Sequence, residues 1–309
     1  MKIIENNKDY YDQSIDEIKL LRYVKTNCDD CDKKNIIRMI DYFYHKEHLF
    51  IVTELLKDNL YDFYKFNRDQ EESLYFTLNR LQKVTKQILE ALDYMHSLNL
   101  IHCDLKPENI LMKSYSNCQV KVIDLGSSCF IHDHLSSYVQ SRSYRAPEVI
   151  LGCKYDFKVD IWSLGCIVAE LYTGYVLFQN ESVVGLLARI LGIVGPIPEH
   201  MAQEGKLVSS YFTNEGILFQ EGGGVDMHSQ NVSESTKKRH RKKMEKEGAT
   251  FDLLLPKITN LKSRLKDVDD DQFINFVTKM LEIDPEKRMS AKEALAHPWI
   301  TESKYPEDN

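Results

Sequence analysis

The amino-acid sequence predicts an α+β protein in which a small mixed region precedes a larger, mostly helical one. Runs rich in Ile, Val, Phe and Tyr, which are typical of strands, are concentrated in the first 56 residues. From Leu81 onwards, apolar residues recur at spacings of three and four, which is typical of helices that bury one face. A chain of 309 residues is about twice the usual length of one domain, which suits two lobes that share a cleft.

The small region is expected to contain one helix and two strands. Between Ile15 and Val24, apolar residues lie three positions apart and form one apolar face, which predicts a helix. The runs NIIRMIDYFYH (residues 35–45) and HLFIVTELL (residues 48–56) are rich in β-branched and aromatic residues and predict strands. These elements together indicate a small α+β unit.

The larger region is expected to begin with a long amphipathic helix over residues 79–97. Two short strands, NILMK (residues 109–113) and VKVID (residues 120–124), are expected to follow it. The run IWSLGCIVAELY (residues 161–172) is too short for a membrane span and is interrupted by an acidic residue, so it predicts a buried core helix. The remainder is expected to be mostly helical, with a less regular insert at about residues 196–256.

Composition argues against some broad classes of function. The chain has 40 Lys and Arg against 47 Asp and Glu, a net charge of −7, which argues against general affinity for nucleic acid or anionic membranes. It has no run of 18 apolar residues, and its first residues lack the apolar centre of a signal peptide. Seven scattered cysteines predict reduced thiols in an intracellular protein, cytoplasmic, nuclear or both. Cys28 and Cys31 form a CxxC pair that could be half a zinc site, but no second pair completes it, which favours a polar loop.

Two short segments carry the side chains that phosphoryl transfer from a nucleotide to a hydroxyl requires. HCDLKPEN (residues 102–109) supplies Asp104, Lys106 and Asn109, and VIDLG supplies Asp124 at the end of an apolar run. Asp104 is expected to accept the hydroxyl proton, while Lys106 places a positive charge beside the transferred phosphate. Asn109 and Asp124 offer the hard oxygen ligands that Mg²⁺ prefers. Each residue alone could be a cap or a turn former, but their combination favours catalysis.

These segments resemble motifs of the eukaryotic protein kinases and occur in that family's order. HCDLKPEN resembles H-R-D-x-K-x-x-N, Asp124–Gly126 resembles D-F-G, and Ala146–Glu148 matches A-P-E. The resemblance covers nearly the whole chain and implies a bilobal kinase fold with ATP and Mg²⁺ as cofactors. It implies a partial small lobe and hinge over residues 1–56, a mostly helical large lobe over residues 57–300 and a tail over residues 301–309.

The resemblance also implies roles for residues outside these motifs. Lys2 matches the strand lysine that binds nucleotide phosphates, and Glu17 matches the helix glutamate that pairs with it. Thr53 stands at the gatekeeper position before the hinge. Contacts with ATP are further implied for Glu54, Leu56 and Leu111. Structural roles are implied for His102, for Asp160, which braces the catalytic loop, and for Glu148 with its partner Arg288.

Within the kinases, the stretch SSYVQSRSYRAPEVILG (residues 136–152) resembles the dual-specificity tyrosine-regulated kinases, the DYRK group of the CMGC class. Members of that group phosphorylate themselves on the second tyrosine of a Tyr-x-Tyr pair. Tyr138 is that tyrosine here, and a serine replaces the first. A phosphate adds about −1.5 to −2 charges, which Arg142 and Arg145 are expected to receive. Cys103 replaces the H-R-D arginine that takes this role in other kinases.

The resemblance implies protein substrates that are phosphorylated on serine or threonine. Similar kinases often favour arginine before the target residue and proline after it, and Glu108 is the expected partner of that arginine. The basic run KKRHRKK (residues 237–243) in the insert has six Lys or Arg in seven positions. It favours a solvated surface, with an import-receptor signal or an acidic-partner site as the alternative.

One element of the kinase family, the G-x-G-x-x-G loop that closes over the phosphates, is not found ahead of Lys2. Only Met1 precedes Lys2, so the small lobe is expected to lack its first two strands. Two explanations are open. The chain is either a fragment of a longer kinase, which we favour because the catalytic residues are complete, or a short form with an impaired nucleotide site. A non-catalytic pseudokinase or scaffold is therefore the alternative function.

Overall fold

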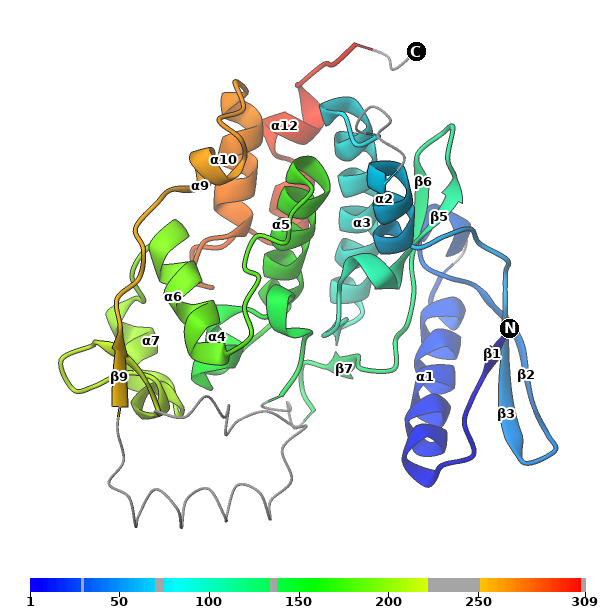
Figure 1. Cartoon of the computed structure of the whole chain (residues 1–309). Coiled ribbons are helices and arrows are strands. Elements are labelled where there is room, and N and C mark those ends of the chain that lie inside the picture. Colours follow the sequence, from blue (N-terminus) through cyan, green and yellow to red (C-terminus); the bar gives the residue numbers. More distant parts are fainter. Residues whose placement is uncertain (29–30, 70–74, 134–137, 222–250, 307–309) are drawn as a thin grey trace.

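The computed structural model describes residues 1–309 except 29–30, 70–74, 134–137, 222–250 and 307–309. Three strands and one helix form a small lobe, and a larger lobe is built mostly of helices (Figure 1). This arrangement confirms the predicted α+β class. Ser136 and the basic run at residues 237–243 lie outside the described residues.

The small lobe is a three-stranded antiparallel sheet with one helix packed beside it (Figure 1). Its strands, in the order β1-β3-β2, are β1 (Lys2–Ile3), β2 (Met39–His45) and β3 (His48–Thr53). Helix α1 (Lys8–Thr26) buries Ile18 and Leu21, as the apolar spacing predicts. The helix begins before the periodic stretch because Asn7 caps it, accepting the N–H of Asp9 at 2.9 Å.

Two buried helices form the centre of the large lobe. Helix α3 (Leu78–Ser97) begins one residue before the predicted start and has Thr77 as its N-cap. Helix α5 (Lys158–Thr173) is buried on almost every side and ends at Gly174, whose φ of 87° suits glycine. In the described part of the chain, the large lobe also contains α2 (Leu60–Asp69), α4 (Pro147–Leu151), α6 (Val183–Ile193), α7 (Glu199–Glu204), α9 (Leu261–Arg264), α10 (Asp271–Met280), α11 (Ala291–Leu295) and α12 (Pro298–Thr301). Among the described residues, no helix has both the length and the apolar character needed to cross a bilayer.

Two short antiparallel ribbons carry the segments with catalytic motifs. Strand β4 (Leu100–Ile101) pairs with β7 (Cys129–Phe130). Strand β5 (Ile110–Ser114) pairs with β6 (Gln119–Val122), close to the predicted strands. The loop before β5 and the loop after β6 therefore lie at the same end of one ribbon.

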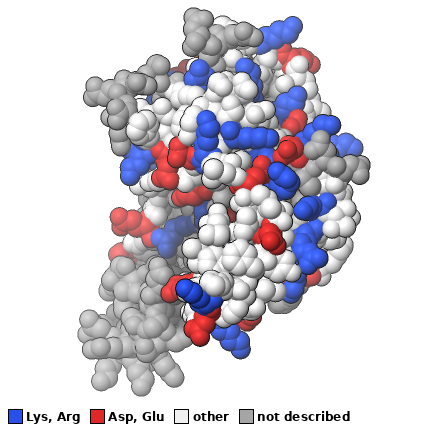
Figure 2. Space-filling view, turned by 90° about the vertical axis from the view of Figure 1, so that its right-hand side faces the viewer, with Lys and Arg blue, Asp and Glu red and all other residues white. Residues whose placement is uncertain are grey.

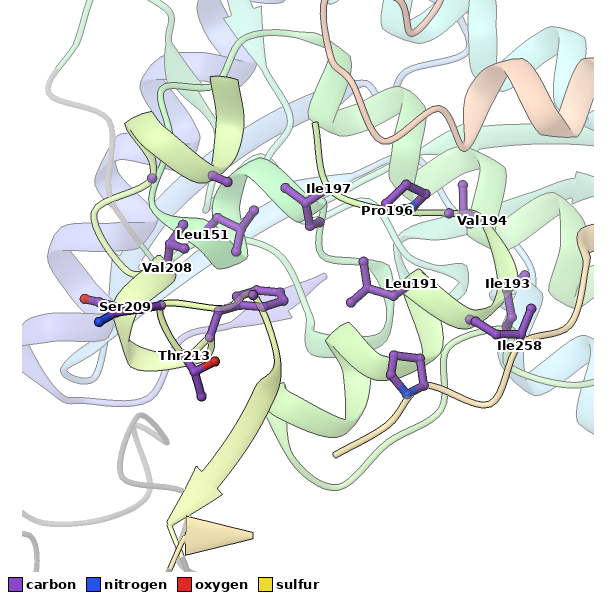
Figure 3. A pocket seen from close by; sticks show the side chains of 18 of the residues that line it. Leu151, Leu191, Ile193, Val194, Pro196, Ile197, Val208, Ser209, Thr213 and Ile258 are labelled. Carbon is purple, nitrogen blue, oxygen red and sulfur yellow. The ribbon is translucent and has the colours of Figure 1, made fainter. Parts of the chain in front are cut away.

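The insert contains a pair of antiparallel strands that the sequence pattern did not predict. Strand β8 (Leu218–Glu221) pairs with β9 (Phe251–Leu254). A cavity of about 860 Å³ lies beside it, with apolar walls from Leu151, Leu191 and Ile258 (Figure 3). None of the residues predicted to be functional lines this cavity.

Charged side chains of both signs share the face of the molecule that is seen from the right-hand side of Figure 1. Figure 2 shows acidic and basic side chains interspersed over the described part of this face. Although the chain has a net charge of −7, the described part of this face is not a surface patch of a single sign.

Candidate active site

The catalytic loop runs from β4 to β5 and is held by a buried aspartate of α5. Oδ2 of Asp160 accepts the N–H of His102 at 2.9 Å, and Oδ1 accepts the N–H of Cys103 at 3.1 Å. The buried His102 ring places Nε2 3.0 Å from the carbonyl oxygen of Ile123, just after β6. These bonds connect the two loops and support the φ of 64° at Cys103, a left-handed conformation that is uncommon for residues other than glycine.

Asp104 lies at the centre of a cluster that can receive a hydroxyl proton. Its Oδ2 is 2.7 Å from Nζ of Lys106, and its Oδ1 accepts the hydroxyl of Ser141 at 2.8 Å. Nδ2 of Asn109 donates to the backbone carbonyl of Asp104 at 2.8 Å. Because a hydroxyl already lies within hydrogen-bond distance of the carboxylate, the geometry suits a general base acting on a hydroxyl.

Asn109 and Asp124 lie on adjacent segments, since the N–H of Ile123 donates to the carbonyl of Asn109 at 2.9 Å. Asp124 has a φ of 63°, and its Oδ1 accepts the N–H of Gly126 at 3.3 Å. A Cβ on Gly126 would lie 3.2 Å from that Oδ1, so the glycine keeps space beside the carboxylate. The amide and carboxylate oxygens suit Mg²⁺.

No group of three or more His, Cys, Asp and Glu in the described part of the chain could hold a metal ion by itself. A Mg²⁺ ion held by Asn109 and Asp124 would take its remaining ligands from water or from substrate phosphates, as Mg²⁺ commonly does. The pair fits a metal that arrives with a nucleotide.

Lys2 and Glu17 form an ion pair across the small lobe. Nζ of Lys2 lies 2.8 Å from Oε2 of Glu17 and 3.5 Å from Oδ1 of Asp124. Burial opposes the charge of Lys2, but the two carboxylates outweigh it and raise the pKa of Lys2 above its usual value. All three residues line a cavity of about 300 Å³. A cation that faces this cavity can bind phosphate groups.

The segment after β3 joins the lobes and pairs with β5. The N–H of Lys57 donates to the carbonyl of Met112 at 2.8 Å. Three of the residues expected to bind ATP are partly buried in this region, namely Thr53, Leu56 and Leu111. The carboxylate of Glu54 instead lies 2.5 Å from Nζ of Lys121. The Glu54 side chain is therefore engaged by the protein, which leaves only the backbone of this residue for a nucleotide.

A second buried ion pair joins the segment after the activation loop to the end of the large lobe. Nη1 and Nη2 of Arg288 donate to the two carboxylate oxygens of Glu148, at 2.6 and 2.9 Å. Both side chains are inaccessible to solvent. The bidentate geometry is the arrangement in which a buried pair of this kind is most stable.

The activation segment brings Tyr138 and Arg145 together. The Arg145 guanidinium lies 4.2 Å from the centre of the Tyr138 ring. Its Nε and Nη2 also donate to the carbonyl of Gln140, at 3.2 and 2.8 Å. Nη1 of Arg142 donates to the carbonyl of Glu181.

The Cys103 thiol lies against the thiol of Cys129. Its sulfur lies 3.4 Å from that of Cys129, and the Cys129 thiol together with burial raises the pKa of Cys103. The position of the usual H-R-D arginine is thus taken by a buried thiol without positive charge.

Two functional candidates were not predicted from the sequence. Ser141 donates to Asp104 and accepts from Nζ of Lys106 at 3.2 Å, so it orients both groups. Glu170 is buried in α5 and accepts the hydroxyl of Tyr144 at 2.7 Å. The pKa of Glu170 is raised to about 7, chiefly by burial and also by the charge of Glu108, while the Tyr144 hydrogen bond acts in the opposite direction. Glu170 lies in an apolar run, and that pattern indicates a buried core helix rather than a functional site.

Comparisons with known proteins agree with this geometry. Residues 1–300 match the model of the protein kinase domain. The chain is 38% identical over 97% of its length to the probable serine/threonine-protein kinase dyrk2 of Dictyostelium discoideum, of which the match covers 30%. It is 36% identical over 98% of its length to human dual specificity tyrosine-phosphorylation-regulated kinase 3, of which the match covers 49%.

The Caenorhabditis elegans kinase mbk-2 is 37% identical over 97% of this chain, and the match covers 35% of that relative. The chain thus spans less than half the length of these three relatives. Family membership rests on the domain match, which includes every motif described above. The chain belongs to the protein kinase family, and the relatives with which it shares 36–38% identity are kinases of the DYRK group.

Proposed function

We propose that this chain is the catalytic domain of a kinase that transfers the γ-phosphate of ATP to serine or threonine hydroxyls of proteins. The convergence of Asp104, Lys106 and Asn109 in one loop, with Asp124 on the adjacent segment, carries the proposal. Phosphoryl transfer needs positioning and charge stabilisation more than covalent chemistry, and this cluster supplies both.

Asp104 would orient the substrate hydroxyl and take its proton as the oxygen–phosphorus bond forms and the bond to the β-phosphate oxygen breaks. Lys106, 2.7 Å from Asp104, would neutralise charge on the transferred group. Lys2, oriented by Glu17, would hold the α- and β-phosphates of the nucleotide. Mg²⁺ bound by Asn109 and Asp124 would supply further positive charge beside the phosphates.

Two carboxylates support selection of an arginine before the target residue. Burial, and after it the charge of Glu108, raises the pKa of Glu170, whose carboxylate also accepts the Tyr144 hydroxyl at 2.7 Å. Two carboxylates whose charges repel one another provide a favourable site for a guanidinium, which relieves that repulsion. Arginine peptides should therefore bind more tightly than their alanine counterparts.

The backbone at Gln140 supports selection of proline after the target residue. Its φ is 67°, and its carbonyl accepts two hydrogen bonds from Arg145. An occupied carbonyl is a poor acceptor for a substrate N–H, and proline alone has no backbone N–H to leave unsatisfied. Proline therefore incurs no penalty at this position.

We also propose that Tyr138 is phosphorylated by the enzyme itself. Its side chain is 39% exposed, and Arg145 already lies against its ring. A phosphate would give Arg145 and Arg142 a charge-assisted acceptor. Mass spectrometry of the purified wild type and of Tyr138→Phe, with Tyr175→Phe as an exposed control, tests this assignment. An active wild type without phosphate on Tyr138 would refute it.

The central test is phosphate transfer to peptides that carry the sequence Arg-x-x-Ser-Pro. The wild type should label them with Mg-ATP, and Asp104→Asn should abolish labelling while it retains the fold. Asp252→Asn, on the exposed strand β9, is the matched control and should retain activity. Equal labelling by the wild type and Asp104→Asn would contradict the assigned base.

A further inference from the structure

Lys121, on β6, is a buried lysine with no part in the chemistry proposed above. Its side chain is 1% exposed, and Nζ lies 2.5 Å from both Oε1 of Glu54 and Oδ1 of Asp32. The hydrogen bond from Lys121 lowers the pKa of Asp32. A buried ammonium group is costly unless it is paired, so this lysine is held where both carboxylates meet.

The three charged groups belong to three separate segments that meet at the β5–β6 ribbon. Asp32 lies between α1 and β2, Glu54 lies in the connection between the lobes, and Lys121 lies in the large lobe. Oε1 of Glu54 also accepts the backbone N–H of Arg38 at 2.8 Å. The Glu54 carboxylate therefore connects the hinge to the large lobe at Lys121 and to the small-lobe segment at Arg38.

Backbone hydrogen bonds hold the two edges of the same ribbon. On the β6 edge, the N–H of Val122 donates to the carbonyl of Asn35 at 2.8 Å. On the β5 edge, the N–H groups of Lys57 and Met112 donate to the carbonyls of Met112 and Asp58, at 2.8 and 2.9 Å. Hydrogen bonds therefore hold the ribbon along both edges. The Lys121 ammonium adds ion pairs to the two adjoining segments, through Asp32 and Glu54.

Lys121 is directly opposite Leu111 in the β5–β6 register. Opposed residues of an antiparallel pair project from the same face of the ribbon. Leu111 is expected to contact ATP, and Asp124 follows Lys121 by three positions, just beyond the end of β6. Lys121 thus lies opposite an expected ATP contact, Leu111, and shortly before an expected metal ligand, Asp124.

We propose that Lys121 is a positioning residue for the nucleotide. Its ion pair with Glu54 fixes the hinge backbone relative to Leu111 and Asp124, which sets the distance between the adenine and metal contacts. This inference rests on the proposed kinase function. Without the ammonium, the Glu54 carboxylate would turn towards water, and the hinge would move more freely against the ribbon.

The test compares Lys121→Met with the matched control Lys113→Met. Lys113 lies on the adjacent strand with a side chain 39% exposed, and its Nζ is 3.9 Å from Asp32. Lys121→Met should weaken ATP binding in calorimetry and raise the KM for ATP about tenfold, with kcat changed by less than about twofold. Amide hydrogen exchange at Glu54 and Lys57 should accelerate without nucleotide. Lys113→Met should leave all of these unchanged.

If Lys121 had only a structural role, Lys121→Met would lower the amount of folded protein. It would not raise the KM for ATP while leaving kcat nearly unchanged. Unchanged ATP affinity in Lys121→Met, or a loss confined to kcat, would overturn the inference. If Lys121→Met does not fold, Glu54→Gln, which removes the charge and keeps the shape, should weaken ATP binding in the same direction, and an unchanged affinity would overturn the inference too. A wild type that binds ATP without transferring phosphate refutes the proposed function alone, whereas one that binds no ATP refutes both.

Discussion

Replacing Glu170 with glutamine should stabilise the folded chain increasingly as pH rises. Burial raises the pKa of Glu170 from 4.5 to about 7, so the folded state keeps this proton over a range in which the unfolded chain has lost it. Folding therefore takes up a proton between those values, and stability falls as pH rises through them. Above pH 7 the folded chain holds a buried carboxylate, and the difference between about 7 and 4.5 corresponds to about 3 kcal/mol.

Glutamine removes this cost because it is neutral at every pH and still offers an oxygen to the Tyr144 hydroxyl. In urea denaturation, the stability gained by Glu170→Gln should increase by about 2–3 kcal/mol between about pH 5 and pH 8. Glu215→Gln, at an exposed turn position, is the control and should show no such increase. A stability difference that stays constant with pH, or that falls as pH rises, would refute the reasoning.

Three further substitutions test other parts of the structure. Arg288→Met leaves the buried Glu148 carboxylate without its cation and should lower stability by about 3–5 kcal/mol in urea denaturation, whereas the exposed Lys292→Met should not. Gly126→Ala places a Cβ 3.2 Å from the Asp124 carboxylate and should lower kcat by about tenfold or more at an unchanged melting temperature. Unchanged turnover would contradict this. Glu108→Gln should raise the peptide KM only for substrates with arginine before the target residue, and an equal rise for alanine peptides would exclude an arginine site.

The residues that carry the chemistry could be predicted because they are close together in the sequence. A span of six positions, residues 104–109, contains Asp104, Lys106 and Asn109. A loop this short must bring them near one another. Glu170 was not predicted, since it lies in an apolar run and gains its meaning only from Tyr144, which packs against it in the fold. Lys121 was missed for the same reason, because its two partners come from distant segments.

Local pattern predicted helices better than it predicted distant strand pairs. The spacing of apolar residues gave the α3 helix to within one residue of its start. The pairing of β8 with β9 has no comparable local signal, because more than twenty residues separate the two strands. A short strand is stabilised by its partner, and sequence periodicity does not identify a partner.

Arg145 links two properties that need not depend on each other. The same guanidinium that lies against the Tyr138 ring also binds the carbonyl of Gln140. If this planar group tilts towards a phosphate on the tyrosine, its hydrogen bonds to that carbonyl must change as well. In the proposed kinase, the maturation of the activation loop and the preference for proline are therefore coupled through one side chain. The preference for proline would thus be present in the newly folded chain and would change during maturation.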